Sequence, residues 1–265
     1  MSIDKNLLKR LTLLYVEDDD IIRNELSQLL ANFFSQVLVA KDGKEGLRTF
    51  LENQDTIDIV LTDINMPLYN GIEMVKKIRN IDSKISVIFA TAYSDNEFLL
   101  DAIKLRVQEY IIKPIDIRKL LSFLNDIASN LYQEFLLKQQ QYELTKYKEI
   151  LDSNNIVIKT DARLNITYVN QLFCDISGYS DSELIGKEFK SLKFPDVSND
   201  IYTDLYAKVL NNKPWHGNLK NIKKDKTHYT CDTHVFPTVG ENGEMNGAIS
   251  IQKDITKELN KKREI

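Results

Sequence analysis

The chain has 265 residues, 43% of them hydrophobic and 28% charged, which is long enough for two globular domains and too apolar for a disordered protein. Its net charge of −4, with no basic stripe along the sequence, argues against a protein that binds nucleic acid directly. The two cysteines, Cys174 and Cys231, form no pairing pattern, which indicates a reduced compartment. The N-terminus lacks the apolar core of a signal peptide, and no apolar run approaches the roughly 20 residues of a membrane span. We therefore expect a cytoplasmic protein without membrane association.

From residue 11 to about residue 127, short apolar strands alternate with amphipathic helices. The expected strands cover residues 11–16, 37–40, 57–62, 85–90 and 110–112. The expected helices cover residues 20–34, 44–51, 72–81 and 95–105, and another helix begins at residue 117. This alternation is typical of a parallel sheet with helices on both faces, so the first half is predicted to be an α/β, flavodoxin-like fold with five parallel strands.

Charged side chains stand where three of these strands end. Glu17 and Asp18 follow the first strand, Asp63 follows the third, and Lys113 follows the last. Because the carboxyl ends of parallel strands share one edge of the sheet, these four side chains are predicted to meet in one shallow pocket. Carboxylate oxygens suit Mg²⁺, which keeps several waters and also takes a phosphoryl oxygen. Asp63 in such a pocket is a candidate nucleophile toward phosphorus.

Part of this pattern also has a purely structural interpretation. The run of four acids at 17–20 suits the N-terminus of the following helix, with Asp19 or Asp20 as its cap. Lys113, which precedes a proline, could be an ordinary loop charge. A flavodoxin-like fold without phosphorylation, however, has no need of Asp63, Lys113 and Thr91 together.

Several motifs occur in order, each at a strand end: Val-Glu-Asp-Asp at 16–19, Asp-Ile-Asn-Met-Pro-Leu-Tyr-Asn-Gly at 63–71, Thr-Ala at 91–92, Tyr110, and Lys-Pro at 113–114. With these motifs, residues 11–125 resemble the receiver domain of bacterial response regulators. The resemblance fails at Leu-Arg-Val, residues 105–107, where the family usually has glycine or alanine in a tight turn. This departure concerns the conformation of the loop rather than the chemistry of the pocket.

The resemblance implies that Asp63 accepts a phosphoryl group from a phosphohistidine on a histidine kinase or a phosphotransfer protein. It implies Mg²⁺ as the cofactor, with Asp18, Asp63 and the backbone carbonyl of Asn65 as ligands and Glu17 assisting through water. The metal would offset the repulsion between carboxylates and the incoming phosphoryl group.

The remaining residues that the resemblance assigns form the switch. Lys113 would contact the phosphoryl oxygens, and Thr91 would donate its hydroxyl to the same group. Tyr110 would then rotate from an exposed to a buried position. Catalysis by the protein is expected to be limited to phosphorylation and dephosphorylation of its own receiver domain.

The helix that begins at residue 117 is expected to continue to about residue 152, because this stretch contains no glycine or proline. Leu137, Leu144 and Leu151 recur at heptad spacing, with Gln140 and Tyr147 between them. This is a weak coiled-coil seam, and it predicts a homodimer through the helix. The alternative is a single solvated connector helix.

The pattern changes to strands after residue 153. Strands are expected at 156–160, 166–169, 217–223, 228–237 and 247–254, with a hairpin turn at 240–243, which indicates an α+β module with an antiparallel sheet. Residues 161–170, Phe173, Ser-Gly-Tyr-Ser at 177–180, Glu-Leu-Ile-Gly-Lys at 183–187, Pro-Trp-His-Gly at 214–217 and Asp-Ile-Thr at 254–256 resemble a PAS domain. The predicted division is therefore a receiver domain at 1–125, a helical linker at 126–152, a PAS domain at 153–256 and the start of a signalling helix at 257–265.

The ligand of the PAS domain is left open by the sequence. The helix after Pro195 offers no axial histidine for haem, and the segment after Gly186 offers no cysteine for a photoactive flavin adduct. A looser likeness to aerotaxis-type PAS domains implies FAD, with Trp215 beside the flavin ring and Asn221 as a hydrogen-bonding partner. The alternative is an empty pocket or another ligand, with Trp215 simply packed. The three histidines, at 216, 228 and 234, are interpreted as surface or strand residues rather than ligands.

Together these features predict a phosphorelay protein that couples phosphorylation at Asp63 to a PAS sensor or interaction domain. No helix-turn-helix follows the receiver, so direct DNA binding is not expected. Two alternatives remain. The chain could be the regulatory N-terminal part of a longer enzyme, such as a diguanylate cyclase or a hybrid histidine kinase, or it could be a flavin redox sensor.

Overall fold

The computed structural model describes residues 3–67, 69–91 and 105–263, and the chain divides into two compact units, Met1–Gln139 and Gln140–Ile265. The first unit contains a five-stranded, all-parallel sheet in the order β2-β1-β3-β4-β5. Its strands are β1 (Thr12–Val16), β2 (Gln36–Ala40), β3 (Ile59–Asp63), β4 (Ser86–Thr91) and β5 (Glu109–Ile112). Its described helices are α1 (Lys5–Leu8), α2 (Asp20–Leu30), α3 (Gly43–Glu52), α4 (Gly71–Ile81) and the first part of α6 (Ile117–Asn154). This arrangement confirms the predicted fold class of the first half.

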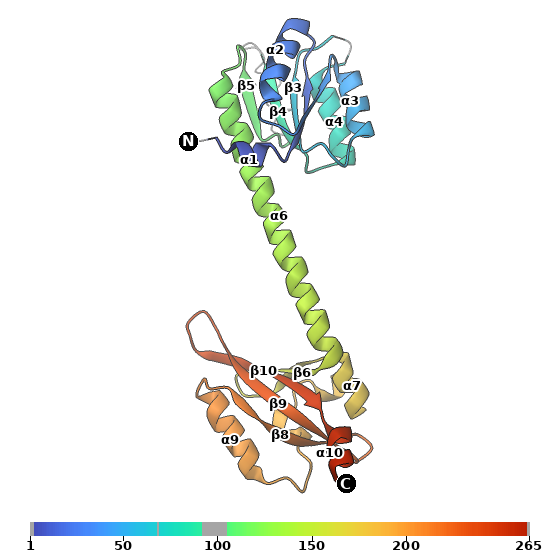
Figure 1. Ribbon diagram of the computed structural model, residues 1–265, viewed down its shortest axis with the longest axis vertical. Helices are drawn as coiled ribbons and strands as arrows, with labels where there is room; N and C mark the ends of the chain where they lie inside the picture. Colours follow the sequence, from blue (N-terminus) through green and yellow to red (C-terminus); the bar gives the residue numbers. More distant parts are fainter. Residues whose placement is uncertain (1–2, 68, 92–104, 264–265) are drawn as a thin grey trace. The chain divides into compact units, whose positions relative to one another are not determined.

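Both faces of this sheet are buried by helices. On one face, apolar residues of α3 and α4, such as Phe50 and Val75, pack against Leu14 and Val16 of β1. On the other face, residues of α2 and α6, such as Leu26 and Leu124, form a second core (Figure 1). Burial on both faces explains why β1 and β3 read as continuous apolar runs rather than alternating ones.

Two of the predicted helices do not match a described helix over their full length. The helix predicted over 20–34 is α2, and it ends earlier, at Leu30. The side chain of Asn32 donates to the carbonyls of Gln28 and Leu29, and Phe34 turns into the core with 1% of its surface exposed. The helix predicted over 95–105 falls almost entirely outside the described residues.

The second unit contains an antiparallel sheet of five strands in the order β7-β6-β10-β9-β8, which confirms the predicted α+β fold. Its strands are β6 (Ile156–Asp161), β7 (Ile166–Val169), β8 (Trp215–Ile222), β9 (His228–Val239) and β10 (Met245–Asp254). Its helices are α7 (Gln171–Ser177), α8 (Asp181–Leu184), the 3-10 helix η1 (Phe189–Leu192), α9 (Asn199–Leu210) and α10 (Thr256–Arg263). One face of the sheet packs on these helices around Phe173, Leu205, Leu219 and Tyr229.

The helix α6 is continuous from Ile117 to Asn154. Its first turns pack on the parallel sheet through Leu120, Leu124 and Ile127, whereas the side chains at 133–151 are exposed. Among the described residues, no helix combines the length and the apolarity that a membrane span requires.

Candidate phosphoryl-acceptor site

The structure brings the predicted charged residues together at the carboxyl edge of the parallel sheet. Glu17 directly follows β1, Asp63 is the last residue of β3, and Lys113 directly follows β5. The Lys113 Nζ lies 2.5 Å from Asp63 Oδ2 and 2.9 Å from each carboxylate oxygen of Glu17. Glu17 is fully buried and Asp63 is 6% exposed, so one ammonium group bridges two buried carboxylates and offsets only part of their charge.

Residues that the sequence analysis did not single out hold Glu17 in place. The hydroxyl of Tyr15 donates to Glu17 Oε2 at 3.2 Å, and the Arg23 guanidinium donates to the backbone carbonyls of Glu17 and Asp18. Burial raises the pKa of Glu17; the hydrogen bonds and charge of Lys113 oppose this, and the carboxylate of Asp63 adds to it. Burial also raises the pKa of Tyr15, so its hydroxyl stays protonated and serves as a donor. The buried carboxylates therefore keep their negative charge at a cost in free energy, and a bound cation would reduce that cost.

Asp63 is oriented from its own strand and from the start of α4. Its Oδ1 accepts a hydrogen bond from the backbone N–H of Asn65 at 3.1 Å, while Oδ2 faces Lys113. A Cβ at Gly71 would lie 2.1 Å from the Asp63 carbonyl oxygen, so only glycine allows α4 to begin this close to the end of β3. The glycine in the predicted 63–71 motif therefore positions the acceptor residue.

The pocket has the donor set that Mg²⁺ takes. One carboxylate oxygen from each of Glu17, Asp18 and Asp63 lies within 4.8 Å of the others, and Asp18 is exposed at the rim. A hard divalent cation prefers oxygen ligands and retains water on its open positions. The residues present fit Mg²⁺, and its charge would relieve the repulsion between the carboxylates. The predicted cap is also observed: Asp19 caps α2 by accepting from the N–H groups of Ile21 and Ile22.

The predicted switch residues Thr91 and Tyr110 lie on β4, which pairs with the strand of Asp63, and on β5, the next strand beyond it. Thr91 is the last residue of β4, and its carbonyl accepts from the backbone N–H of Lys113 at 2.8 Å. Tyr110 lies on the edge strand β5 with 47% of its surface exposed, between Glu109 and the buried Ile111. This is the outward position from which the predicted rotation would start.

Hydrogen bonds from Arg79 explain how residues 105–107 turn without glycine. Arg106 adopts a left-handed backbone conformation, with φ of 51°. The guanidinium of Arg79, at the end of α4, donates to the carbonyls of Leu105 and Arg106 at 3.0 and 3.2 Å, and also to that of Ile85. These hydrogen bonds fix a conformation that costs about 1–2 kcal/mol for a residue with a Cβ.

The two residues named for the PAS ligand lie in the interior of that domain. Trp215 is 5% exposed, and its Nε1 donates to Asp204 Oδ2 at 2.9 Å. Asn221 is 2% exposed; its Oδ1 accepts from the hydroxyl of Tyr202, and its Nδ2 donates to Gln252. Among the described residues, the hydroxyl of Tyr229 is the buried side-chain polar atom that lacks a hydrogen-bond partner.

Comparison with known proteins assigns both halves. Residues 13–125 match the response regulator receiver domain family, and residues 153–257 match the PAS domain family. A nitrogen fixation regulatory protein of Klebsiella pneumoniae is 34% identical over 97 residues, which are 37% of this chain and 20% of that protein. The aerotaxis receptor of Escherichia coli K12 is 28% identical over 122 residues, 46% of this chain and 24% of the receptor.

A third relative, the transcriptional regulatory protein HptR of Staphylococcus aureus (strain NCTC 8325 / PS 47), is 30% identical over 159 residues, 59% of each chain. The chain thus spans from a fifth to about three fifths of these relatives. The receiver and PAS domains are regulatory domains, and the parallel and antiparallel sheets described above are their folds. Residues 13–125 therefore belong to the response regulator receiver domain family, and residues 153–257, which follow them, belong to the PAS domain family.

Proposed function

We propose that Asp63 accepts a phosphoryl group from a phosphohistidine on a histidine kinase or a phosphotransfer protein. The observation that carries this proposal is the bridge of Lys113 between Asp63 and the buried Glu17 at 2.5 and 2.9 Å, with Asp18 at the rim. A structural ion pair needs one acid, whereas this pocket holds three around a single ammonium. Such an excess of carboxylates is suited to a divalent cation and, through it, to a phosphoryl group.

Each residue of the pocket has a separate role in the proposed phosphoryl transfer. An Asp63 carboxylate oxygen forms a bond to phosphorus while the bond from phosphorus to the donor's imidazole nitrogen breaks, and the imidazole keeps that electron pair. In this proposal, Lys113 moves its hydrogen bond from Asp63 to a phosphoryl oxygen, and Thr91 donates its hydroxyl to another. Asp18, Asp63 and the Asn65 carbonyl, with Glu17 nearby, would hold Mg²⁺, whose positive charge would offset the repulsion between the carboxylates and the phosphoryl group. The inward movement of Thr91 makes room for Tyr110 to rotate, which converts the charge change into a change of surface.

Removal of the metal tests this function. In the presence of Mg²⁺, acetyl phosphate is expected to introduce one acid-labile phosphoryl group per chain, detected by mass spectrometry of the intact protein. Excess EDTA should reduce this labelling by at least about a hundredfold, because three carboxylates with a single ammonium repel the donor when no cation shields them, and renewed Mg²⁺ should restore it. Labelling that is equally fast in EDTA would contradict the proposed role of the acids.

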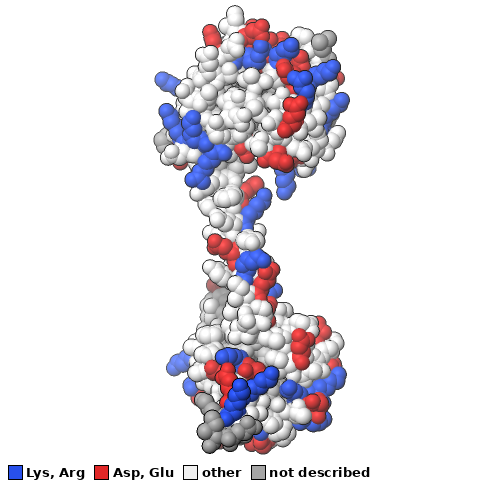
Figure 2. All heavy atoms as spheres, turned by 45° about the vertical axis from the view of Figure 1, so that its right-hand side comes forward, with Lys and Arg blue, Asp and Glu red and all other residues white. Residues whose placement is uncertain are grey.

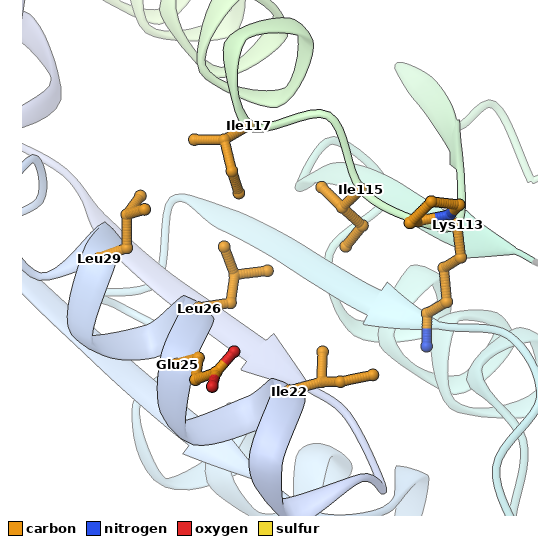
Figure 3. Close-up of a pocket in the computed structure, with 8 residues that line it drawn as sticks. Ile22, Glu25, Leu26, Leu29, Lys113, Ile115 and Ile117 are labelled. Carbon is orange, nitrogen blue, oxygen red and sulfur yellow. The ribbon is translucent and has the colours of Figure 1, made fainter.

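We further propose that the phosphoryl donor docks on α2, beside the acceptor. An apolar groove of about 350 Å³ opens between α2 and the segment that follows β5, next to Lys113. Figure 3 shows its lining residues: Ile22, Glu25, Leu26 and Leu29 from α2, and Lys113, Ile115 and Ile117 from the facing segment. Ile22 is 39% exposed despite its apolar side chain, and this side chain points toward that of Lys113 (Figure 3). A helix of the donor that carries the phosphohistidine could cover this groove and reach Asp63.

Ile22→Asp should therefore slow transfer from the protein donor by at least about tenfold, since covering an isoleucine contributes about 1.5–3 kcal/mol. Labelling by acetyl phosphate, which needs no docking, should stay unchanged. Ile21→Asp is the matched control: Ile21 is 70% exposed on the same helix but does not line the groove. Equal rates for both variants with the protein donor would place docking elsewhere.

For the output, we propose a conformational signal passed through a homodimer of α6, without DNA binding and without catalysis beyond the chain's own phosphorylation and dephosphorylation. On the described surface in Figure 2, Lys and Arg are interspersed with Asp and Glu, in keeping with the net charge of −4. Such a surface gives little general attraction to a phosphate backbone. In a longer protein, the same signal could regulate an enzymatic domain such as a diguanylate cyclase or a histidine kinase.

The second candidate function is that of a flavin-binding PAS domain, and it is favoured by the sequence similarity between part of this chain and the aerotaxis receptor. The two side chains named for FAD do not form a ready site, because Trp215 already donates to Asp204 and the amide of Asn221 is bonded at both ends. We expect freshly purified native protein to be colourless, so that the PAS domain acts as an interaction module. Flavin absorption in the visible spectrum, retained at about one equivalent after gel filtration, would instead make it a redox sensor.

A further inference from the structure

Two histidines and an aspartate cluster on the exposed face of the PAS sheet, away from the interior. His216 on β8 lies directly opposite His234 on the antiparallel strand β9. Asp232 precedes His234 by two residues on β9, so its side chain projects from the same face of the sheet. The strands thus bring three side chains of metal-binding types to one point of the surface, whereas the sequence alone indicates surface or strand histidines rather than ligands.

The distances between the three side chains approach those of a metal site. His216 Nε2 lies 2.7 Å from Asp232 Oδ1, and the rings of His216 and His234 stack with centroids 4.0 Å apart and planes at 15°. One ligand atom from each of the three residues lies within 4.8 Å of the others. Neighbouring ligands on a metal with bonds of about 2.0–2.2 Å are about 3 Å apart. The first pair is slightly closer than this spacing, and the ligand atom of His234 lies within 4.8 Å of both.

The surroundings leave room for an ion. The side chains of His216 and Asp232 are 59% and 39% exposed, so an ion can enter from solvent and keep water on its open positions. The ring of Phe236 stacks beside His234 at 6.2 Å, which restrains that imidazole on one side. Lys253, opposite Asp232 on β10, pairs with Glu258 at 3.4 Å. The carboxylate of Asp232 is therefore directed to His216.

We propose that His216, Asp232 and His234 bind a divalent transition metal ion such as Zn²⁺ or Cu²⁺. Two imidazole nitrogens and one carboxylate oxygen suit these borderline ions, whereas Mg²⁺ prefers the all-oxygen set of Glu17, Asp18 and Asp63. The ion would take the place of the proton shared between His216 and Asp232 and would tie β8 to β9. The two sites select different metals and function independently.

Calorimetric titration of the full chain with Zn²⁺ tests this, with millimolar Mg²⁺ present to occupy the receiver acids. The wild type should bind one Zn²⁺. His234→Gln and Asp232→Asn should each weaken binding by at least about tenfold, the lower end of what even outer partners of a metal contribute. His228→Gln is the matched control, because His228 is an exposed β9 histidine whose ring lies against Phe194 rather than in the cluster. Its affinity for Zn²⁺ should equal that of the wild type.

Thermal unfolding without Zn²⁺ checks that the variants fold, and exposed substitutions should leave the transition nearly unchanged. Added Zn²⁺ should raise the transition temperature of the wild type and of His228→Gln, but not that of His234→Gln. The proposal is overturned if the wild type binds no Zn²⁺ under these conditions. It is also overturned if folded His234→Gln binds as tightly as the wild type, or if His228→Gln loses affinity to the same extent.

Discussion

Asp63→Asn is expected to abolish phosphoryl labelling of the chain, by acetyl phosphate and by a protein donor alike. The amide oxygen of asparagine is too weak a nucleophile to form the bond to phosphorus. Asparagine keeps the size of the side chain and can still accept from the Asn65 N–H or from Lys113, as Asp63 does. The substitution also removes one of the charges that raise the pKa of Glu17, so the fold should be retained. The loss of labelling should therefore be complete, in a protein that unfolds at or above the wild-type temperature.

Asp58→Asn is the matched control for this experiment. Asp58 lies just before the same strand, β3, and its Oδ2 accepts from the backbone N–H of Thr12 at 2.8 Å. Burial raises the pKa of this carboxyl as well, yet it lies at the opposite end of the strand from Lys113. Labelling of Asp58→Asn should match the wild type. An acid-labile phosphoryl group that persists on Asp63→Asn would assign the acceptor to another residue.

Much of the fold could be predicted from the sequence because most strands have a local signature. The residues of β7, Ile166–Val169, coincide with the predicted strand, and the predicted hairpin turn lies between β9 and β10. The end of α2 has no such local signature, because the residues after Leu30 are also compatible with a helix. The buried position of Phe34 and the amide of Asn32 decide the boundary, and neither contact can be read from periodicity. The four residues of α1 are too few for a periodic pattern.

The site, like the fold, combines features that the sequence predicts with features that depend on tertiary packing. That Glu17, Asp63 and Lys113 share one edge follows from strand ends in a parallel sheet, and the structure places them within hydrogen-bonding distance. The support from Tyr15 and Arg23 depends on how β1 and α2 pack, and their types alone give no signal of it. A tyrosine two residues before an acid on a strand does face the same way, and that spacing could have identified Tyr15.

The second large expected effect concerns dimerisation through the linker helix α6. Eight large apolar side chains of α6 are exposed: Phe135, Leu136, Leu137, Tyr142, Leu144, Tyr147, Ile150 and Leu151. A single helix with so many exposed apolar groups has little to stabilise it in water, whereas a parallel pair buries those that lie on its seam. Leu137, Leu144 and Leu151 lie seven residues apart and are 56%, 67% and 44% exposed, so they form one seam. We expect sedimentation equilibrium of the wild type to give twice the mass of the chain.

Leu144→Glu should convert this dimer to a monomer. Each buried leucine contributes about 1.5–3 kcal/mol, and a symmetric dimer loses two of them, so dissociation should strengthen by a factor of about 10²–10⁴. Tyr142→Glu is the matched control: Tyr142 is 64% exposed on the same helix, but it lies on the outer side of a seam that contains Leu144. It should remain dimeric. A monomeric wild type would refute the seam, and equal dissociation of both variants would show that exposed apolar area in general, not the heptad register, holds the chains together.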